Sequence, residues 1–363
     1  GNFNGKDHDR NAILHTALKT HDDSPHYAFI DLEEDLRDPK LEEEASRHGI
    51  RIIRSFHNFT GVPDDLVSRV KLLAQRPGEL PKAAVYPRSS GEIRALLAAF
   101  NRLAGVRKIM LGMGPYGFFT RVLAGPLGSY LTYTSGDGKS AAPGHINPHT
   151  LQTLYRFSTI SETTSIYGII GDPVMHTASP RIHNPGFARA GMDAVYIPFQ
   201  TDSVTDFIDI ARALGMKGFS VTIPHKEAII PHLGEKDASV DNAGACNTVV
   251  VRDGILCGYN TDGSGFMAPL LSSYGADGLC GRKATVIGAG GAAKAIVLAL
   301  VRAGVEVLIV NRTPERAAGL AEQFGCSWAG LDKEGIALMR QHADLIVQTT
   351  SVGMEPDTEG DPV

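Results

Sequence analysis

The sequence predicts an α/β protein built on parallel sheets, and two observations carry this prediction. Residues 283–316 read as a β-branched strand, a glycine turn, an Ala- and Leu-rich helix and a second strand, which together form a βαβ unit. Residues 1–155 alternate short apolar runs with helical segments, a pattern typical of a parallel sheet covered by helices. Since 363 residues suggest two or three domains, we expect several α/β regions in succession.

The composition is that of a globular protein with a sizeable core. Of the residues, 43% are hydrophobic and 21% are charged, and the formal net charge is -5 at pH 7. No basic run and no stretch of membrane-spanning length occur, so neither nucleic acid nor a membrane is expected as a partner. The four cysteines lack metal-ligand spacing, which predicts no metal site and a reducing compartment. We expect the cytoplasm, or a plastid if a transit peptide precedes residue 1.

The first region, residues 1–155, is expected to contain five short strands. They are expected at 27–32, 51–59, 82–86, 108–113 and 128–133. An acidic helix running to His48 and helices at 63–75 and 91–103 separate the first four of these strands.

Three side chains of this region lie where strands end or loops begin. His57 closes the second strand, Lys82 opens the third, and Arg121 follows a glycine-bearing loop. A buried lysine with a depressed pKa can condense with a ketone, a neighbouring histidine can move protons, and an arginine can bind a carboxylate. Each residue alone would more often be structural or solvated, but their joint occurrence favours a site.

The stretches IDLEE, SFHNF, PKAAVYP, LGMGPYGFFTR and AAPGH resemble type I 3-dehydroquinate dehydratase, a (β/α)8 barrel that eliminates water through a lysine Schiff base. The resemblance implies that Lys82 forms the imine, His57 is the general acid and base, and Arg121 binds the carboxylate. The family commonly has Ser-Ala-Pro-Gly-Gln in its last loop, where this chain has Ala141 and, in last place, His145, which can still donate a hydrogen bond to the substrate. Because such a barrel needs eight strands, we expect a partial barrel. The chain begins with GNFNGKDHDR and ends with EPDTEGDPV, both of loop character, so we expect it to be cut at both ends.

A polar connection rich in Ser and Thr, residues 156–165, is the expected linker. A strand at 166–170 follows, and the loop after it carries Thr177 and Ser179, two hydroxyls that could bind a small carboxylate. Ser179 could equally cap the next helix with Pro180 as its first residue, and both roles could hold together.

The most informative run of residues 166–270 is the strand that delivers Lys226 to the start of a helix. The clusters at 245–248 and 258–263 follow at the ends of two further segments, the second containing Asp262. A lysine and an aspartate that converge beside a dinucleotide site can hold a substrate hydroxyl and relay its proton during hydride transfer.

The βαβ unit has the features of a dinucleotide site. Gly288 permits the tight turn, Gly290 lets the backbone approach a pyrophosphate, Ala293 lets the helix pack on the strand, and the helix N-terminus supplies free N–H groups. Where an NAD-preferring unit places a carboxylate, this chain offers Arg312 and Arg316, which suit a 2′-phosphate and favour NADP. The alternative is that both arginines are solvated charges at the start of a helix.

Residues 166–354 resemble shikimate dehydrogenase through IYGIIGDPVMHTASPRIHN, SVTIPHK, GACNT, GYNTDG, VIGAGGAAKA, NRTPERA and TTSVGM. The resemblance implies a substrate-binding domain at 166–270 and an incomplete Rossmann-type domain at 271–363, with Lys226 and Asp262 as the catalytic pair. The implied substrate-binding residues are Thr177, Ser179, Thr222 and Asn247. The residues expected to bind NADP are Gly288, Gly290, Gly291, Ala293, Asn311, Arg312, Thr313 and Arg316.

Together the resemblances predict a bifunctional enzyme of the shikimate pathway, which dehydrates 3-dehydroquinate and reduces the product to shikimate with NADPH. Thr177 replaces a usual serine, which leaves oxidation of quinate or shikimate with NAD as an alternative. A regulator that binds pathway intermediates without turnover is a further alternative, and retention of Lys82, His57, Lys226 and Asp262 counts against it.

Overall fold

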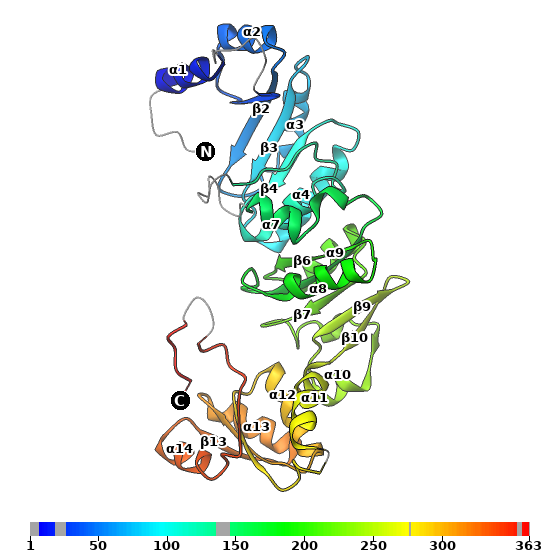
Figure 1. The fold of residues 1–363 in the computed structure, drawn as a ribbon, viewed down its shortest axis with the longest axis vertical. Coiled ribbons are helices and arrows are strands. Elements are labelled where there is room, and N and C mark those ends of the chain that lie inside the picture. The colour runs from blue at the N-terminus through cyan, green and yellow to red at the C-terminus, as the bar shows by residue number, and fades with distance from the viewer. Residues whose placement is uncertain (1–6, 19–26, 136–145, 276, 354–357, 363) are drawn as a thin grey trace. The chain divides into compact units, whose positions relative to one another are not determined.

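The computed structural model describes residues 7–18, 27–135, 146–275, 277–353 and 358–362 (Figure 1). The chain forms two compact units. The first comprises Gly1–Ile169 with Thr177–Met216, and the second comprises Ile170–His176 with Lys217–Val363. None of the described helices combines the length and the apolar character needed to cross a membrane.

The first unit contains a parallel sheet in the order β1-β2-β3-β4 (Figure 1). Its strands are β1 (Phe29–Glu33), β2 (Arg51–Asn58), β3 (Leu80–Val85) and β4 (Ile109–Gly112). The helices around it are α1 (Asp7–Leu18), α2 (Pro39–Arg47), α3 (Leu66–Ala74) and α4 (Ser90–Arg102). Because the strands pair in chain order with a helix in each connection, the sheet has the winding of a (β/α) barrel, as predicted.

The fifth predicted strand, at 128–133, is wrong. The structure reduces it to a single parallel bridge between Lys108 and Ser129. The hydroxyl of Ser129 accepts a hydrogen bond from Met110 N at 3.0 Å and donates one to Leu131 O at 2.9 Å. The Ser129 side chain therefore bonds backbone groups of Met110 and Leu131 that would otherwise be available for pairing between strands.

Two short helices, α5 (Gly114–Gly117) and α6 (Phe119–Val122), follow β4 and bring Arg121 into the interior. The turn is tight, because a Cβ on Gly117 would collide with the backbone of Gly112. The helix α7 (Pro148–Thr153) and the 3-10 turn η1 (Phe157–Thr159) come next.

The rest of the first unit holds β5 (Ser165–Gly171), whose last two residues belong to the second unit, its neighbour β6 (Ala194–Gln200), and helices α8 (Ser179–Arg189) and α9 (Val204–Ala213). Helix α9 contacts α4, where Arg94 Nη1 donates to Asp206 Oδ1 at 2.6 Å and Ser90 N donates to Asp202 Oδ1 at 2.8 Å.

Helix α8 begins one residue earlier than predicted. Ala178 is its N-cap, and Ser179 is the first helical residue in place of Pro180. The cap role of Ser179 is therefore wrong, because Thr177 provides the oxygen instead: Ser179 N donates to Thr177 Oγ1 at 3.2 Å.

The second unit starts with strands that are neighbours in the order β7 (Gly218–Val221), β9 (Thr248–Arg252), β10 (Ile255–Tyr259) and β8 (Glu235–Lys236). The pairs β7–β9 and β9–β10 are antiparallel, and β10–β8 is parallel. The turn η2 (Ile230–His232) and helices α10 (Ala238–Ala243) and α11 (Asp262–Tyr274) complete this part.

A parallel sheet of order β13-β12-β11-β14 forms the rest of the second unit (Figure 1). Its strands are β11 (Lys283–Ile287), β12 (Glu306–Asn311), β13 (Ser327–Gly330) and β14 (Leu345–Gln348). Helices α12 (Gly291–Arg302), α13 (Pro314–Phe324) and α14 (Lys333–Met339) connect them. Val286, Val297, Leu300 and Ile309 are fully buried between sheet and helices, which confirms the predicted βαβ unit.

Candidate active sites

The strand register of the first unit gathers polar side chains on one face. Ser55 of β2 pairs with Glu33 of β1 and with Lys82 of β3. Because side chains alternate along a strand, Asp31 and His57, each two residues from a member of this row, point to the same face. The register thus brings Lys82 and His57 together, as predicted, and adds two carboxylates.

Lys82 is buried, with 5% of its surface exposed, and its ammonium contacts Asp31 with Nζ and Oδ2 2.6 Å apart. The hydroxyl of Tyr133 donates to the same oxygen at 2.9 Å, and Lys82 Nζ stands 4.1 Å from the centre of the Tyr133 ring. Burial raises the pKa of Asp31, but Lys82 and the hydrogen bonds outweigh burial and hold that pKa below its ordinary value. Asp31 is therefore an anion that fixes the position of the lysine.

His57 lies at the end of β2 beside Glu33, with Nδ1 and Oε1 2.7 Å apart. Nδ1 makes no hydrogen bond to a described residue, and the contact is an ion pair when the imidazole is protonated. Burial raises the pKa of Glu33, whereas His57 lowers it by more and leaves it below its ordinary value. A carboxylate at one ring nitrogen orients the imidazole, as proton transfer through the other nitrogen requires.

Arg121 is 1% exposed and only partly satisfied. Its Nη1 donates to Tyr133 O at 3.2 Å, while the buried Nε and Nη2 have no partner among the described residues. Burial lowers the pKa of this guanidinium to about 10. Two unused donors on a buried arginine match the two oxygens of a carboxylate, which agrees with the predicted role.

The structure describes only some of the other predicted substrate-binding residues. His145 and Ala141 lie outside the described residues. Thr177 and Ser179 belong to the first unit, where Thr177 Oγ1 donates to Ser179 Oγ at 3.1 Å.

In the second unit, Lys226 and Asp262 form an ion pair with Nζ and Oδ2 2.5 Å apart. Asn247 Nδ2 donates to the second carboxylate oxygen at 2.7 Å. The three residues come from the turn after β7, the residue before β9 and the first turn of α11. Since the carboxylate holds both neighbours, Lys226 is oriented to exchange a proton with a bound oxygen.

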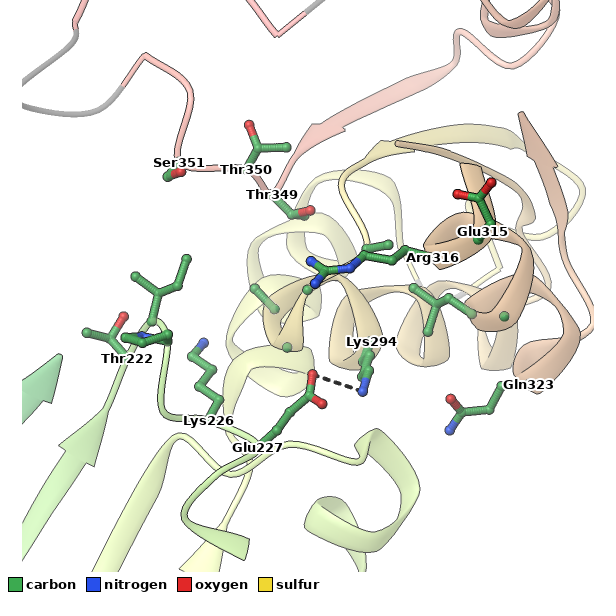
Figure 2. Close-up of a pocket in the computed structure, with 18 residues that line it drawn as sticks. Thr222, Lys226, Glu227, Lys294, Glu315, Arg316, Gln323, Thr349, Thr350 and Ser351 are labelled. Carbon is green, nitrogen blue, oxygen red and sulfur yellow. Dashed lines mark ion pairs between the residues drawn. The ribbon is translucent and has the colours of Figure 1, made fainter. Parts of the chain in front are cut away.

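Lys226 lines a cavity of about 800 Å³ that also meets the glycine turn (Figure 2). The predicted residues that line it are Thr222, Lys226, Gly290, Gly291 and Arg316. The predicted cofactor residues that do not line it are Gly288, Ala293, Asn311, Arg312 and Thr313.

The cavity fits a ligand that carries phosphate groups. A Cβ on Gly290 would meet no atom within 4 Å, so the backbone before α12 is open to a ligand. The N-terminus of this helix offers N–H groups to an anion, and Arg316 extends from α13 toward the cavity (Figure 2). Lys294, which was not predicted, lines the same cavity and pairs with Glu227 at 3.0 Å.

Sequence reasoning missed Asp31, Glu33 and Tyr133. The two acids lie two apart on a strand and therefore share one face of it, but their spacing does not show that this face meets Lys82. Tyr133 carries no such signal. In the part of the chain that the structure describes, no group of three or more His, Cys, Asp or Glu side chains could hold a metal ion.

Family models match three stretches of the chain. Type I 3-dehydroquinase matches residues 1–162, the shikimate dehydrogenase substrate binding domain matches residues 169–249, and shikimate / quinate 5-dehydrogenase matches residues 271–354.

Relatives cover either the whole chain or its second part. The bifunctional 3-dehydroquinate dehydratase/shikimate dehydrogenase, chloroplastic, of Arabidopsis thaliana is 32% identical over 384 residues, which include all of this chain but span only 62% of that relative. The shikimate dehydrogenase (NADP(+)) of Caldanaerobacter subterraneus subsp. tengcongensis is 40% identical over 213 residues, 56% of this chain and 74% of the relative.

Solved structures of shikimate dehydrogenases are also similar to the second part of the chain. The shikimate dehydrogenase of Aquifex aeolicus has a TM-score of 0.51 and 37% identity, covering 56% of this chain and 75% of its own. A shikimate dehydrogenase in complex with NADP+ has a TM-score of 0.50 and 36% identity, covering 56% of this chain and 73% of its own.

Proposed function

Because the chain belongs to the shikimate dehydrogenase family and carries a type I 3-dehydroquinase region ahead of it, we propose that it is a bifunctional enzyme of the shikimate pathway. The first region dehydrates 3-dehydroquinate to 3-dehydroshikimate, and the second reduces that product to shikimate with NADPH. The observation that carries the proposal is the presence of two separate constellations in one chain. They are the Lys82–Asp31 pair with its unsatisfied arginine, and the Lys226–Asp262 pair beside a glycine turn.

In the first site, the neutral amine of Lys82 attacks the ketone carbon of the substrate, and loss of water leaves an imine. The imine nitrogen draws electrons from the adjacent carbon, so His57 can remove a proton there. His57 then returns a proton to the departing hydroxide, which leaves as water. Hydrolysis of the imine releases the product and restores the lysine. Arg121 holds the substrate carboxylate throughout, and His145 is proposed as a further contact.

In the second site, Asp262 holds Lys226 while the lysine donates a proton to the carbonyl oxygen that becomes a hydroxyl. The residues proposed to hold the substrate are Thr177, Ser179, Thr222 and Asn247. NADPH, when bound, supplies the hydride. The residues proposed to hold the cofactor are Gly288, Gly290, Gly291, Ala293, Asn311, Arg312, Thr313 and Arg316. Those lining the cavity would contact phosphates, and buried Ala293 would support the turn.

We further propose that residues 1–155 form the dehydratase region and residues 156–165 a linker. Residues 166–270 would form the substrate-binding domain and residues 271–363 the NADP-binding domain. For location we propose the cytoplasm or a plastid, with the chloroplastic Arabidopsis relative supporting the second. A fluorescent fusion of the full-length protein would distinguish them.

The proposed function is tested by giving the full-length protein 3-dehydroquinate and NADPH together and following the absorbance of NADPH. We expect consumption, since both reactions must then run in sequence. Lys82→Ala should stop consumption from 3-dehydroquinate but not from 3-dehydroshikimate, and Lys226→Ala should stop both. Binding of either compound without any NADPH consumption would favour a regulator over an enzyme.

Oxidation of quinate is a second candidate, favoured by Thr177. The added methyl group changes the hydroxyl-bearing loop before α8, where Thr177 contacts Ser179. Rates with quinate and shikimate, each with NAD and with NADP, decide between the two; a higher kcat/KM for quinate with NAD would replace our assignment.

A further inference from the structure

Tyr133 contacts the proposed imine-forming lysine in two ways. Its hydroxyl donates to Asp31 Oδ2 at 2.9 Å, and Lys82 Nζ contacts this same oxygen at 2.6 Å. Its ring lies beside the amine, with Nζ 4.1 Å from the ring centre. Its backbone carbonyl also accepts a hydrogen bond from Arg121 at 3.2 Å. One residue therefore contacts the lysine, the carboxylate that holds the lysine, and the arginine proposed to bind substrate.

From these contacts we propose that Tyr133 is a positioning residue of the dehydratase site, acting on Lys82 through its ring and through Asp31. The inference rests on the proposed function of the first region. It adds a residue that lies outside all of the sequence stretches quoted for this region.

The hydroxyl matters most when Lys82 loses its charge. Attack on a ketone requires the neutral amine, and at that moment the ammonium no longer compensates the buried carboxylate of Asp31. The phenol continues to donate to the shared oxygen. Burial and the neighbouring Asp31 raise the pKa of Tyr133 well above its ordinary value, so the phenol keeps its proton across the neutral range.

The ring acts on the charged forms of the lysine nitrogen. A protonated imine is a cation at the position of the lysine nitrogen, and the face of an aromatic ring attracts a cation within about 6 Å of its centre. At 4.1 Å, the ring can therefore favour both the ammonium and the protonated imine over their neutral forms. The hydroxyl and the ring stabilise successive states of the same site.

Other charged groups reach this cluster from several elements. Those that face Asp31 or Tyr133 are Lys82 on β3, Glu33 on β1, His57 on β2 through Glu33, and Arg121 on α6. Ser55 on β2 also faces Asp31, but its hydroxyl makes no well-formed hydrogen bond. Among the described residues, Tyr133 is thus the neutral group whose side chain donates a hydrogen bond to Asp31, at 2.9 Å.

The test compares Tyr133→Phe with Tyr130→Phe in the full-length protein. Tyr130 is a matched control, because its ring packs against Arg107 and Arg51 and not against Lys82. Sodium borohydride is added with 3-dehydroquinate over a range of pH, and the reduced lysine adduct is followed by mass spectrometry. We expect Tyr133→Phe to form adduct about tenfold more slowly at neutral pH, because a hydrogen bond to a charged group is lost.

The pH profile separates this role from a loss of packing. Without the phenol the pKa of Asp31 rises, so the acid limb of adduct formation should move to higher pH in Tyr133→Phe alone. Tyr133→Leu also removes the ring and should be slower still. A wild-type far-UV circular dichroism spectrum, together with reduction of 3-dehydroshikimate at the wild-type rate, will show that each variant is folded.

Two results would overturn the inference. Tyr133→Phe with the rate and the pH profile of Tyr130→Phe would reject Tyr133 while leaving the proposed function intact. A wild-type protein that forms no adduct at any pH would reject the lysine mechanism itself, and the role of Tyr133 with it.

Discussion

At the scale of residues, two buried arginines of the first unit show how one side chain type serves folding in one place and binding in another. Arg54 is 0% exposed and bonds Glu42 and Glu79 at 2.7 Å and Leu36 O at 2.7 Å. Arg121 is equally buried, yet two of its nitrogens have no partner among the described residues. The first arginine is satisfied within the protein, whereas the second keeps two donors that we propose a ligand takes.

Substitution of each arginine by methionine should therefore have opposite effects. Arg54→Met leaves Glu42 without its ion-pair partner and Glu79 with only its longer contact to Arg76, and should lower the free energy of unfolding by roughly 3–5 kcal/mol. Arg121→Met removes an unsatisfied cation, so stability should stay or rise, while affinity for 3-dehydroquinate falls by about a hundredfold. Urea unfolding and calorimetric titration measure the two quantities. Equal destabilisation by both variants would contradict this division of roles.

The two lysines that line the cavity of the second unit, Lys226 and Lys294, should differ in their effects on catalysis and on NADPH binding. Lys226→Ala removes the proposed proton donor and should lower kcat by about 10²–10⁴ while leaving NADPH affinity nearly unchanged. Lys294→Ala, the matched control, removes a cation that lines the cavity but does not contact Asp262, so it should raise KM for NADPH with little effect on kcat. Steady-state kinetics with 3-dehydroshikimate distinguish them. Loss of NADPH binding in Lys226→Ala would sink its catalytic assignment.

Lys82, His57 and Arg121 could be proposed as site residues from sequence because each lies within a recognisable local stretch. The partners of Lys82 could not, because they depend on register and not on neighbours in sequence. Asp31 is 51 positions from Lys82, and Tyr133 is 102 positions from Asp31. The pairing of β1 with β2 and of β2 with β3 brings Asp31 to Lys82, and the segment that follows α6 carries Tyr133 to them.

At the scale of elements, two glycines have different roles in the turn between β11 and α12. Gly288 has φ +111, and a Cβ there would collide with Thr349 Oγ1. Gly290 has φ -95 and space around it. The first glycine is needed for the fold of the turn, and the second keeps the backbone open.

Alanine at the two positions should distinguish fold from binding. Gly288→Ala should destabilise the second unit by at least about 1–2 kcal/mol, the cost of a left-handed backbone for a residue with a Cβ. Gly290→Ala should melt at the wild-type temperature but bind NADPH about tenfold more weakly, since the methyl group occupies the approach of a phosphate. Thermal melting and fluorescence titration of NADPH provide the readouts. A stable Gly288→Ala variant would show that the turn can relax.

Element prediction succeeded where the hydrophobic period was long, as in α4 and α12, and failed where one polar side chain decided the outcome. Ser129 replaces backbone pairing with its hydroxyl and reduces the strand at 128–133 to one bridge. Thr177 takes over the capping oxygen and moves the start of α8 by one residue. Hydroxyl groups compete with the backbone in ways that periodicity does not register.

At the scale of the whole molecule, lowered carboxyl pKa values are unevenly distributed. Among the described residues they belong to Asp31, Glu33, Asp38 and Glu79 in the first unit and to Asp237 in the second. A carboxyl group with a lowered folded-state pKa adds stability above its ordinary value, 3.8 for Asp and 4.5 for Glu. That stability is lost as the pH falls through the lowered values.

Acid should therefore unfold the first unit before the second. Between pH 5 and about pH 2, we expect far-UV circular dichroism to lose part of its amplitude before the fluorescence of the single tryptophan, Trp328, changes, because Trp328 lies on β13 of the second unit. Glu79→Gln should move the first transition to higher pH, and Asp237→Asn, an exposed control, should not. Coincident transitions in both signals would contradict the prediction.

The contact between α4 and α9 has a consequence for how this protein can evolve. Arg94 belongs to the proposed dehydratase region, and its partner Asp206 belongs to the proposed dehydrogenase region, yet both lie in one compact unit. A mutation selected for its effect on one reaction can therefore alter the folding of the part that serves the other. The two proposed activities would then be inherited as linked traits, and an exchange of either gene segment with a single-function relative would have to bring a compatible helix face with it.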